Sequence, residues 1–207
     1  MKNNTIITIS RQYGSGGRLI GQKLAERLGI PFYDKELITL AAEESGFAEH
    51  LFEKNDRNIT NSLLYSLSMY GNTMGLYDMP LNDKLFIAQS KTIQNVAEKG
   101  PCVIVGRCAD VILKDYHPLN LFVYADAESK IQRCIDRAPE GEHLSRNDIA
   151  RRMKQVDKNR AQYRQMFADS KWGAKETYHL CVNTSGHQIK DLIPGLAAFV
   201  RCWYGEK

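Results

Sequence analysis

The stretch SRQYGSGGRLIG, residues 10–21, holds a glycine-rich turn at the point where a strand pattern gives way to a helix pattern. Before the turn, the apolar run at residues 6–9 is typical of a buried strand. After it, Ile20, Leu24 and Leu28 recur at helical spacing. The peptide N–H groups of such a turn, together with the positive end of the following helix, can hold a phosphate group. The stretch therefore predicts a phosphate-binding loop between a strand and a helix.

The loop departs from the pattern G-x-x-x-x-G-K-[ST] at the positions that carry its charge. When Gly16 is aligned with the last glycine, Arg11 stands at the first glycine, Gly17 at the lysine and Arg18 at the hydroxyl residue. A shift by one residue places Arg18 at the lysine, but the first glycine and the hydroxyl are then both missing. Arg11 and Arg18 could replace the lysine with forked, permanently charged donors. A plain tight turn, with Arg18 in solvent, is the alternative that the loop alone leaves open.

Strand-like and helix-like segments alternate along the rest of the chain. Further strands are predicted at residues 31–33, 102–105, 121–125 and 178–183. Two of these runs are continuously apolar, as in parallel strands that are buried on both faces. Asp126 is the predicted N-cap of one helix, and Ser145 with Asp148 has the spacing of a capping box that opens a long basic helix to about Phe167. The alternation predicts an α/β fold with a parallel sheet covered by helices on both faces.

Composition limits the class of protein. The chain has 207 residues, a net charge of +4 and 43% hydrophobic residues, which is typical of one compact domain and excludes disordered and fibrous classes. Its five cysteines include no C-x-x-C pair, which argues against a zinc site and fits a reducing compartment. We expect no signal peptide, no membrane-spanning segment and a cytoplasmic location.

Two segments stand apart from the strand–helix alternation. Residues 47–83 are rich in Asn, Ser, Met and Tyr and predict a helical insert. Its part at residues 63–80 could cover an acceptor molecule or form a homodimer contact. The basic helix at 145–164 could bind nucleic acid, but it lacks aromatic residues at surface spacing for base stacking, so we expect no nucleic-acid partner.

Taken together, the chain resembles the cytidylate kinase-like family of P-loop nucleoside monophosphate kinases. The resemblance rests on residues 6–40, on VIVGRCADVIL at 103–113, on LFVYADAESKIQRCIDR at 121–137, on VDKNRAQYRQ at 156–165 and on YHLCVNTS at 178–185. It implies a single P-loop NTPase-like domain over residues 1–207, with three layers and a five-stranded parallel sheet. It also implies a helical acceptor-binding insert at about 45–83 and a helical lid at about 138–168. The implied activity is transfer of the γ-phosphate of ATP, with Mg²⁺, to a small acceptor, most simply a nucleoside monophosphate.

The resemblance also implies roles for particular residues. Gly14 and Gly16 match the loop glycines of the family. The residues expected to bind the phosphates of ATP are Arg11, Gly14, Ser15, Gly16, Gly17 and Arg18. For the acceptor, the matching positions are Asp34, Arg107 and Asp110. For the stabilisation of transferred charge, the assigned residues are Arg18, Arg160 and Arg164. No residue is assigned to a metal.

Each assignment has a structural alternative. Arg107 could form a salt bridge with Asp110 that holds a turn, and the arginines of the basic helix could be solvated. Arg133 and Arg137 resemble arginines at the entrance of the lid, although helix-surface charge explains them equally well. Lys35 follows Asp34 where the family's cytidylate kinases carry a small hydroxyl residue, which leaves the acceptor open. Because the lysine and hydroxyl of the loop are missing, the alternative function is a nucleotide- or phosphate-binding protein with little kinase activity.

Overall fold

The computed structural model describes residues 5–47, 51, 81–139 and 145–205. Its five strands form one sheet in the order β2-β3-β1-β4-β5. The strands are β1 (Ile6–Arg11), β2 (Phe32–Tyr33), β3 (Cys102–Val105), β4 (Leu119–Tyr124) and β5 (Leu180–Asn183). All neighbouring strands pair in parallel. The predicted α/β class with a parallel sheet is thereby confirmed.

Helices connect the strands. In the described part of the chain they are α1 (Gly17–Leu28), α2 (Glu36–Ser45), α5 (Leu81–Glu98), α6 (Ala109–Ile112), α7 (Ala127–Ile135), α8 (Arg146–Phe167) and α9 (Ile189–Trp203), with short 3-10 turns at Lys114–Tyr116 and Lys175–Thr177. The expected caps form: the Asp126 side chain accepts the N–H of Ser129, and the Ser145 side chain accepts the N–H of Asp148. None of these helices is long and apolar enough to cross a membrane.

Some strand boundaries differ from those predicted. β1 continues to Arg11, because that residue still pairs with Val123 of β4. β5 begins at Leu180 and not at Tyr178, whose ring packs against Phe122 at a centroid distance of 4.9 Å. The predicted insert at about 45–83 falls mainly on residues 48–50 and 52–80, which lie outside the described residues, as does the 63–80 segment.

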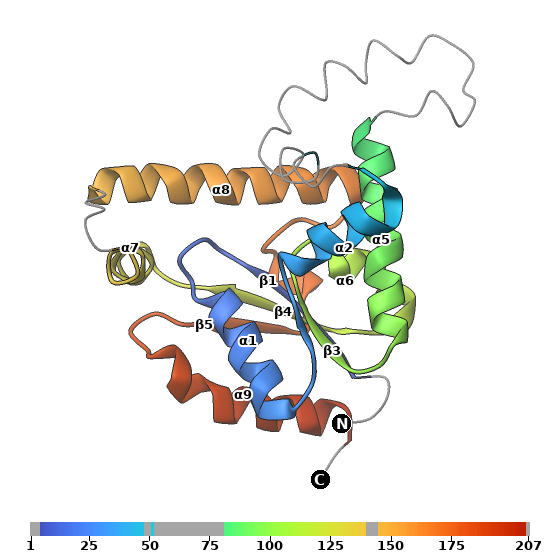
Figure 1. The fold of residues 1–207 in the computed structure, drawn as a ribbon. Helices are drawn as coiled ribbons and strands as arrows, with labels where there is room; N and C mark the ends of the chain where they lie inside the picture. The colour runs from blue at the N-terminus through green and yellow to red at the C-terminus, as the bar shows by residue number, and fades with distance from the viewer. Residues whose placement is uncertain (1–4, 48–50, 52–80, 140–144, 206–207) are drawn as a thin grey trace.

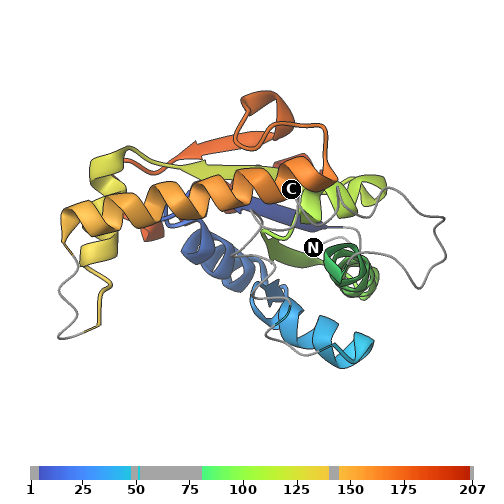
Figure 2. The ribbon, with the colours of Figure 1, turned by 90° about the horizontal axis from the view of Figure 1, so that it is seen from above.

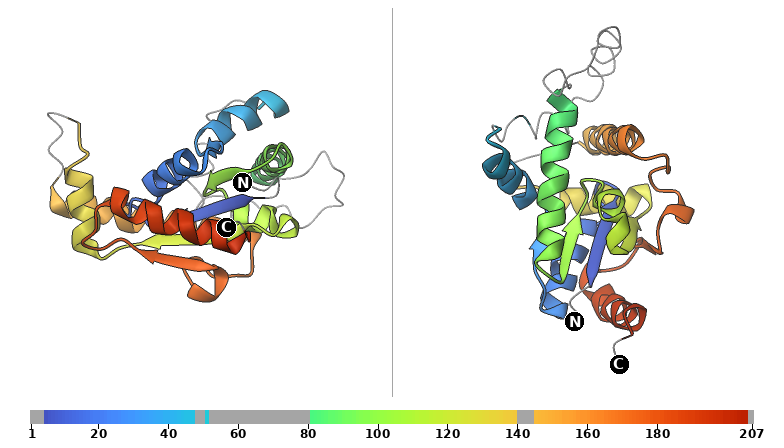
Figure 3. Two further views of the ribbon diagram at one scale, coloured as in Figure 1. Left: turned by 90° about the horizontal axis from the view of Figure 1, so that it is seen from below. Right: turned by 90° about the vertical axis from the view of Figure 1, so that its right-hand side faces the viewer.

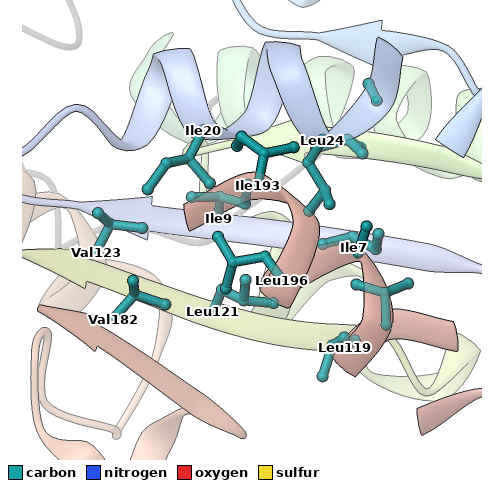
Figure 4. Packing of buried hydrophobic residues seen from close by; sticks show 14 of the residues in the cluster. Ile7, Ile9, Ile20, Leu24, Leu119, Leu121, Val123, Val182, Ile193 and Leu196 are labelled. Carbon is teal, nitrogen blue, oxygen red and sulfur yellow. The ribbon is translucent and has the colours of Figure 1, made fainter. Parts of the chain in front are cut away.

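The layers follow from the alternation of side chains along the strands. Ile7 and Ile9 of β1 point into a core that α1 and α9 cover, with Leu24 of α1 and Leu196 of α9 among its members (Figure 4). Ile6 points to the opposite face, into a core with side chains of α2, α5 and α6. Seen from below, α9 lies across the sheet beside α1 (Figure 3). The sheet is therefore the middle of three layers.

The long helix α8 lies over the sheet, along the top of the molecule in Figure 1, and Figure 2 shows it crossing the fold from the side of α7 to the side of α5. Its carboxyl-terminal end is anchored in the body, because Phe167 stacks on Phe86 of α5 at 3.6 Å and Tyr163 accepts a buried hydrogen bond from Gln89 at 3.0 Å. The remainder of α8 passes over the loop that follows β1. This arrangement brings the basic helix and the glycine-rich loop together.

Candidate active site

The loop between β1 and α1 turns on two glycines with positive φ, Gly14 at 76° and Gly16 at 82°. Gly14 has a second constraint, because a Cβ there would lie 2.9 Å from the carbonyl oxygen of Lys130. The Ser15 hydroxyl donates to the carbonyl of Gln12 at 2.8 Å and closes the turn. α1 begins directly after Gly16, so the loop lies at the amino end of a helix, where anions are favoured.

A cavity of about 510 Å³ opens above this loop. Eight of its lining residues are basic: Arg11, Arg18, Lys35, Arg107, Arg133, Arg137, Arg152 and Arg160. Among the described residues of its lining, the one acidic side chain is that of Asp34. Such an excess of fixed positive charge in a concave site favours a polyanionic ligand. The structure thus brings the arginines of the loop, of the β3 end and of α8 to one cavity.

A second cavity, of about 270 Å³, shares Arg11, Lys35, Arg107 and Arg160 with the first. Its remaining described walls are formed by Ser10, Ile38, Gly106, Cys108, Val156, Asn159, Tyr163, Arg164 and Trp172. The four shared side chains form a basic wall between two spaces. A group held at this wall can be reached from both sides, which is the arrangement that transfer between two bound molecules requires.

Asp34 joins two arginines of the loop region. Its Oδ2 accepts Nε of Arg18 at 2.5 Å, and its Oδ1 lies 3.7 Å from Nη2 of Arg11. Asp34 is 7% exposed, whereas the Arg18 side chain is 55% exposed. The carboxylate therefore sets the direction of both guanidinium groups at the floor of the cavity.

Helix α8 contacts the loop through Asp157 and Arg160. Asp157 Oδ1 accepts the N–H of Tyr13 at 2.8 Å and lies 3.1 Å from Nη1 of Arg160, which also donates to the carbonyl of Arg11 at 3.0 Å. Burial raises the pKa of Asp157, against the opposing effects of the Tyr13 amide and Arg160. Arg152 lies over the Tyr13 ring at 5.7 Å. The D-x-x-R spacing of the sequence thus corresponds to a contact between helix and loop.

On the opposite side of the loop, the Arg133 side chain hydrogen-bonds to the segment that follows β5. It donates to the Thr184 hydroxyl at 3.0 Å and to the carbonyl of His187 at 3.1 Å, and it also contacts the Thr184 carbonyl. The Thr184 hydroxyl in turn donates to the carbonyl of Ser15 at 2.8 Å. Thr184 lies in the segment at 178–185 that carries the family resemblance, but no role was predicted for it, because a lone threonine after a strand matches no motif.

Arg164 and Asp110 form a buried ion pair. Arg164 Nη1 lies 2.6 Å from Asp110 Oδ2, and the two side chains are 4% and 5% exposed. Arg164 also donates to the carbonyl and hydroxyl of Ser170, at 3.0 and 2.8 Å. Both residues were expected to act on the ligands, and a salt bridge between Arg107 and Asp110 was the structural alternative. The pair of Arg164 and Asp110 connects α6 to α8, and Arg164 also lines the smaller cavity.

The arrangement of strands, loop and helices is that of P-loop kinases. A shikimate kinase from Bacteroides thetaiotaomicron is similar to the chain at a TM-score of 0.54 and 15% identity, over 95% of this chain and 98% of that one. A shikimate kinase from Acinetobacter baumannii, solved in complex with shikimate, is similar at a TM-score of 0.51 and 16% identity, over 96% and 93%. These likenesses show the fold.

The chain belongs to the cytidylate kinase-like family, whose model matches residues 6–186. An uncharacterized protein from Eubacterium ventriosum is similar to it at 28% identity and a TM-score of 0.69, over 95% of this chain and 98% of that chain. No curated protein matches the sequence. Family and fold together support phosphotransfer as the general activity. They do not identify the acceptor of the phosphoryl group.

Proposed function

We propose that this protein is a kinase that transfers the γ-phosphoryl group of ATP to a nucleoside monophosphate. The observation that carries the proposal is the basic wall of Arg11, Lys35, Arg107 and Arg160, which two cavities share. In this proposal ATP lies on the glycine-rich loop in the larger cavity and the acceptor lies in the smaller one. The γ-phosphate then rests at the wall between them.

The reaction needs positioning and charge neutralisation from the chain. An acceptor phosphate oxygen forms a bond to the γ-phosphorus while the bond from that phosphorus to the β,γ-bridging oxygen breaks, and ADP leaves with the bond's electron pair. Arg160, at the shared wall, neutralises the charge on the transferred group. Arg18 lines the larger cavity and Arg164 the smaller one, and neither is among the four residues that line both, so we give them positioning roles.

The lining of the site favours an anionic acceptor whose attacking oxygen does not have to be deprotonated by a base. Asp34, the acidic residue of the described lining, is already directed at Arg18 and Arg11. A hydroxyl acceptor would have to lose a proton, whereas the phosphate oxygen of a monophosphate is already ionised at neutral pH. The positive wall also favours an acceptor that carries its own negative charge. Both considerations support a nucleoside monophosphate.

Among the described residues, the loop does not offer the hydroxyl ligand that the phosphate-binding pattern supplies to Mg²⁺. Arg18 occupies the position of the hydroxyl ligand, and no group of three His, Cys, Asp or Glu that could hold a metal occurs in the described ranges. Mg²⁺ is used generally by P-loop kinases, and it would supply neutralisation of the charge on the nucleotide's phosphates. In this proposal it arrives with ATP, and the residues of the site act on the phosphate oxygens.

The test is transfer of label from γ-³²P-ATP to a panel of nucleoside monophosphates by the wild-type protein, by Arg160→Ala and by Arg151→Ala. Arg151 lies on the same helix, but its side chain is 78% exposed and pairs with Asp148, so it controls for loss of a positive charge on α8. We expect labelled nucleoside diphosphate from at least one acceptor, a loss of about 10²- to 10³-fold in kcat for Arg160→Ala, and little change for Arg151→Ala.

Two outcomes would contradict the proposal. If the wild-type protein binds ATP but labels no acceptor, the chain is a nucleotide-binding protein, as the missing lysine and hydroxyl would then explain. If Arg151→Ala loses as much activity as Arg160→Ala, the effect belongs to the general charge of α8 and not to the shared wall.

A further inference from the structure

Gly17 is a glycine for a steric reason. It stands where the phosphate-binding pattern places its lysine, as the first residue of α1. Unlike Gly14 and Gly16, it is not among the residues with positive φ, so its backbone does not demand a glycine. A Cβ at position 17 would lie 2.5 Å from Cβ of Arg11 and 3.1 Å from its Cγ, and it would also lie 3.1 Å from Cβ of Val123, so Arg11 makes the closest of these contacts. The stem of Arg11 therefore fills the space in which a lysine side chain at position 17 would start.

Gly106, at the end of β3, makes room for the other end of the same side chain. A Cβ on Gly106 would overlap Nη1 of Arg11 and lie 3.2 Å from its Cζ. Gly17 at the start of α1 and Gly106 directly after β3 thus border one arginine along its length, and Gly106 also has a positive φ of 80°, which favours glycine in its own right. Asp34 Oδ1 lies 3.7 Å from Nη2 and directs the guanidinium from a further side. Arg11 lines both cavities as a result.

We propose that Arg11 takes the place of the missing loop lysine and binds the phosphate oxygens of the donor nucleotide, and that Gly17 is a glycine to let it do so. This inference rests on the proposed function. It selects Arg11 over Arg18, since the Arg18 side chain is 55% exposed and its Nε is bound to Asp34. A guanidinium that reaches the phosphates from the strand side supplies paired N–H donors, where the lysine would supply a single ammonium.

The steric part of the inference is tested by stability alone. Gly17→Ala should lower the midpoint of thermal unfolding, because the new methyl group meets the Arg11 stem. In the double variant Arg11→Gly with Gly17→Ala, most of that loss should disappear. If Gly17→Ala costs the same in both backgrounds, the two residues do not compete for space and the inference is overturned.

The functional part is tested by exchanging the two residues. Arg11→Gly should weaken ATP binding, measured by calorimetry, and lower kcat/KM for transfer by about 10²- to 10³-fold. The double variant Arg11→Gly with Gly17→Lys, which restores the lysine pattern, should regain at least about tenfold over Arg11→Gly. Arg27→Ala, an exposed charge in the last turn of α1, should bind ATP as the wild type does.

The outcomes separate this inference from the function beneath it. If the wild type binds ATP but Arg11→Gly binds it equally well, or if the exchange variant is no better than Arg11→Gly, then Arg11 does not replace the lysine, while the kinase proposal stands. If the wild type neither binds ATP nor transfers phosphate, the proposed function fails and this inference fails with it, whatever the stability measurements show.

Discussion

Asp157 of α8 accepts the backbone N–H of Tyr13 in the glycine-rich loop at 2.8 Å, so a carboxylate joins the basic helix to the phosphate-binding turn. The same oxygen lies 3.1 Å from Nη1 of Arg160. One side chain therefore fixes both the loop and the arginine that faces the shared wall. The D-x-x-R spacing acquires a physical meaning from this contact, because Asp157 positions Arg160, which lies one helical turn later.

Removal of the Asp157 side chain should uncouple loop and helix. A hydrogen bond to a charged group contributes about 1.5–3 kcal/mol, so Asp157→Ala should lower kcat/KM for ATP by about tenfold to a hundredfold. Asp157→Asn keeps an oxygen for the Tyr13 N–H and should lose less. Lys158→Ala is the control, because Lys158 is the exposed neighbour of Asp157 on the same helix. Steady-state kinetics with ATP as the varied substrate would measure kcat/KM for all three variants. An equal loss in Asp157→Ala and Lys158→Ala would contradict the coupling of loop and helix.

The free energy of unfolding should depend on pH in part through the ionisation of Asp157. Burial raises the pKa of Asp157 above the ordinary 3.8, so the folded state holds this proton more tightly than the unfolded chain does. Ionisation of Asp157 then costs the folded state stability as pH rises through the range just above that value. Asp157→Asn cannot ionise. Urea unfolding between about pH 3 and pH 6 should show the variant gaining relative to the wild type as pH rises, and a flat or falling difference would contradict the assignment.

The buried pair of Arg164 and Asp110 should act on stability more than on chemistry. Loss of one partner leaves an uncompensated charge, so Asp110→Ala should lower the free energy of unfolding by about 3–5 kcal/mol. The double variant Asp110→Ala with Arg164→Ala leaves no lone charge from this pair and should cost less than the two single losses added together. Denaturant unfolding gives all three values. Strictly additive losses would show that the two charges do not depend on each other.

Thr184 should matter to the donor side of the site through its hydroxyl alone. Thr184→Val keeps the shape but removes the hydrogen bonds to Ser15 and Arg133, which should cost about 1–3 kcal/mol. Since the loop loses its support, ATP binding should weaken as well. Thr184→Ser retains the hydroxyl and should behave as the wild type. Calorimetric titration with ATP distinguishes them, and a serine variant as weak as the valine variant would point to packing as the cause.

ATP should stabilise the fold by an amount that grows with the logarithm of the ratio between its concentration and its dissociation constant. A ligand that binds only the folded state adds about 2.7 kcal/mol when it is present at a hundred times its dissociation constant. Because the cavity is lined by basic side chains, inorganic tripolyphosphate should raise the unfolding midpoint too, and adenosine without phosphates should not. A thermal unfolding series with the three ligands provides the comparison. Stabilisation by adenosine alone would contradict a site dominated by phosphate contacts.

The sequence predicted the fold well because its signals are local. The run at residues 102–105 is apolar throughout and the run at residues 6–9 is apolar except for Thr8, as is typical of strands buried on both faces. Asp126 and Ser145 cap helices with residues close to them in the sequence. Strand ends were less well predicted, since the extent of β1 to Arg11 depends on its pairing with β4. A pairing partner that is distant in sequence leaves no mark on the strand itself.

The gathering of several arginines at one cavity was predictable, but their contacts were not. The arginines at positions 11, 18, 107 and 160 were expected near phosphate, and they do line one cavity. The partner of Asp110 was not foreseeable, because Arg164 reaches it from α8 through the tertiary fold. The meaning of Gly17 was equally hidden, since its steric reason lies in the path of the Arg11 side chain. Such contacts arise only when distant parts of the chain come together in the fold.

A crystal structure with a non-hydrolysable ATP analogue and a nucleoside monophosphate tests the central claim most directly. We expect the triphosphate on the loop at Gly14–Gly17, with oxygens of the terminal phosphate within about 3.2 Å of the guanidinium nitrogens of Arg11 and Arg160. The monophosphate should occupy the smaller cavity, on the other side of the same wall. A triphosphate bound elsewhere, or bound at the loop with both guanidinium groups turned away from it, would contradict the account.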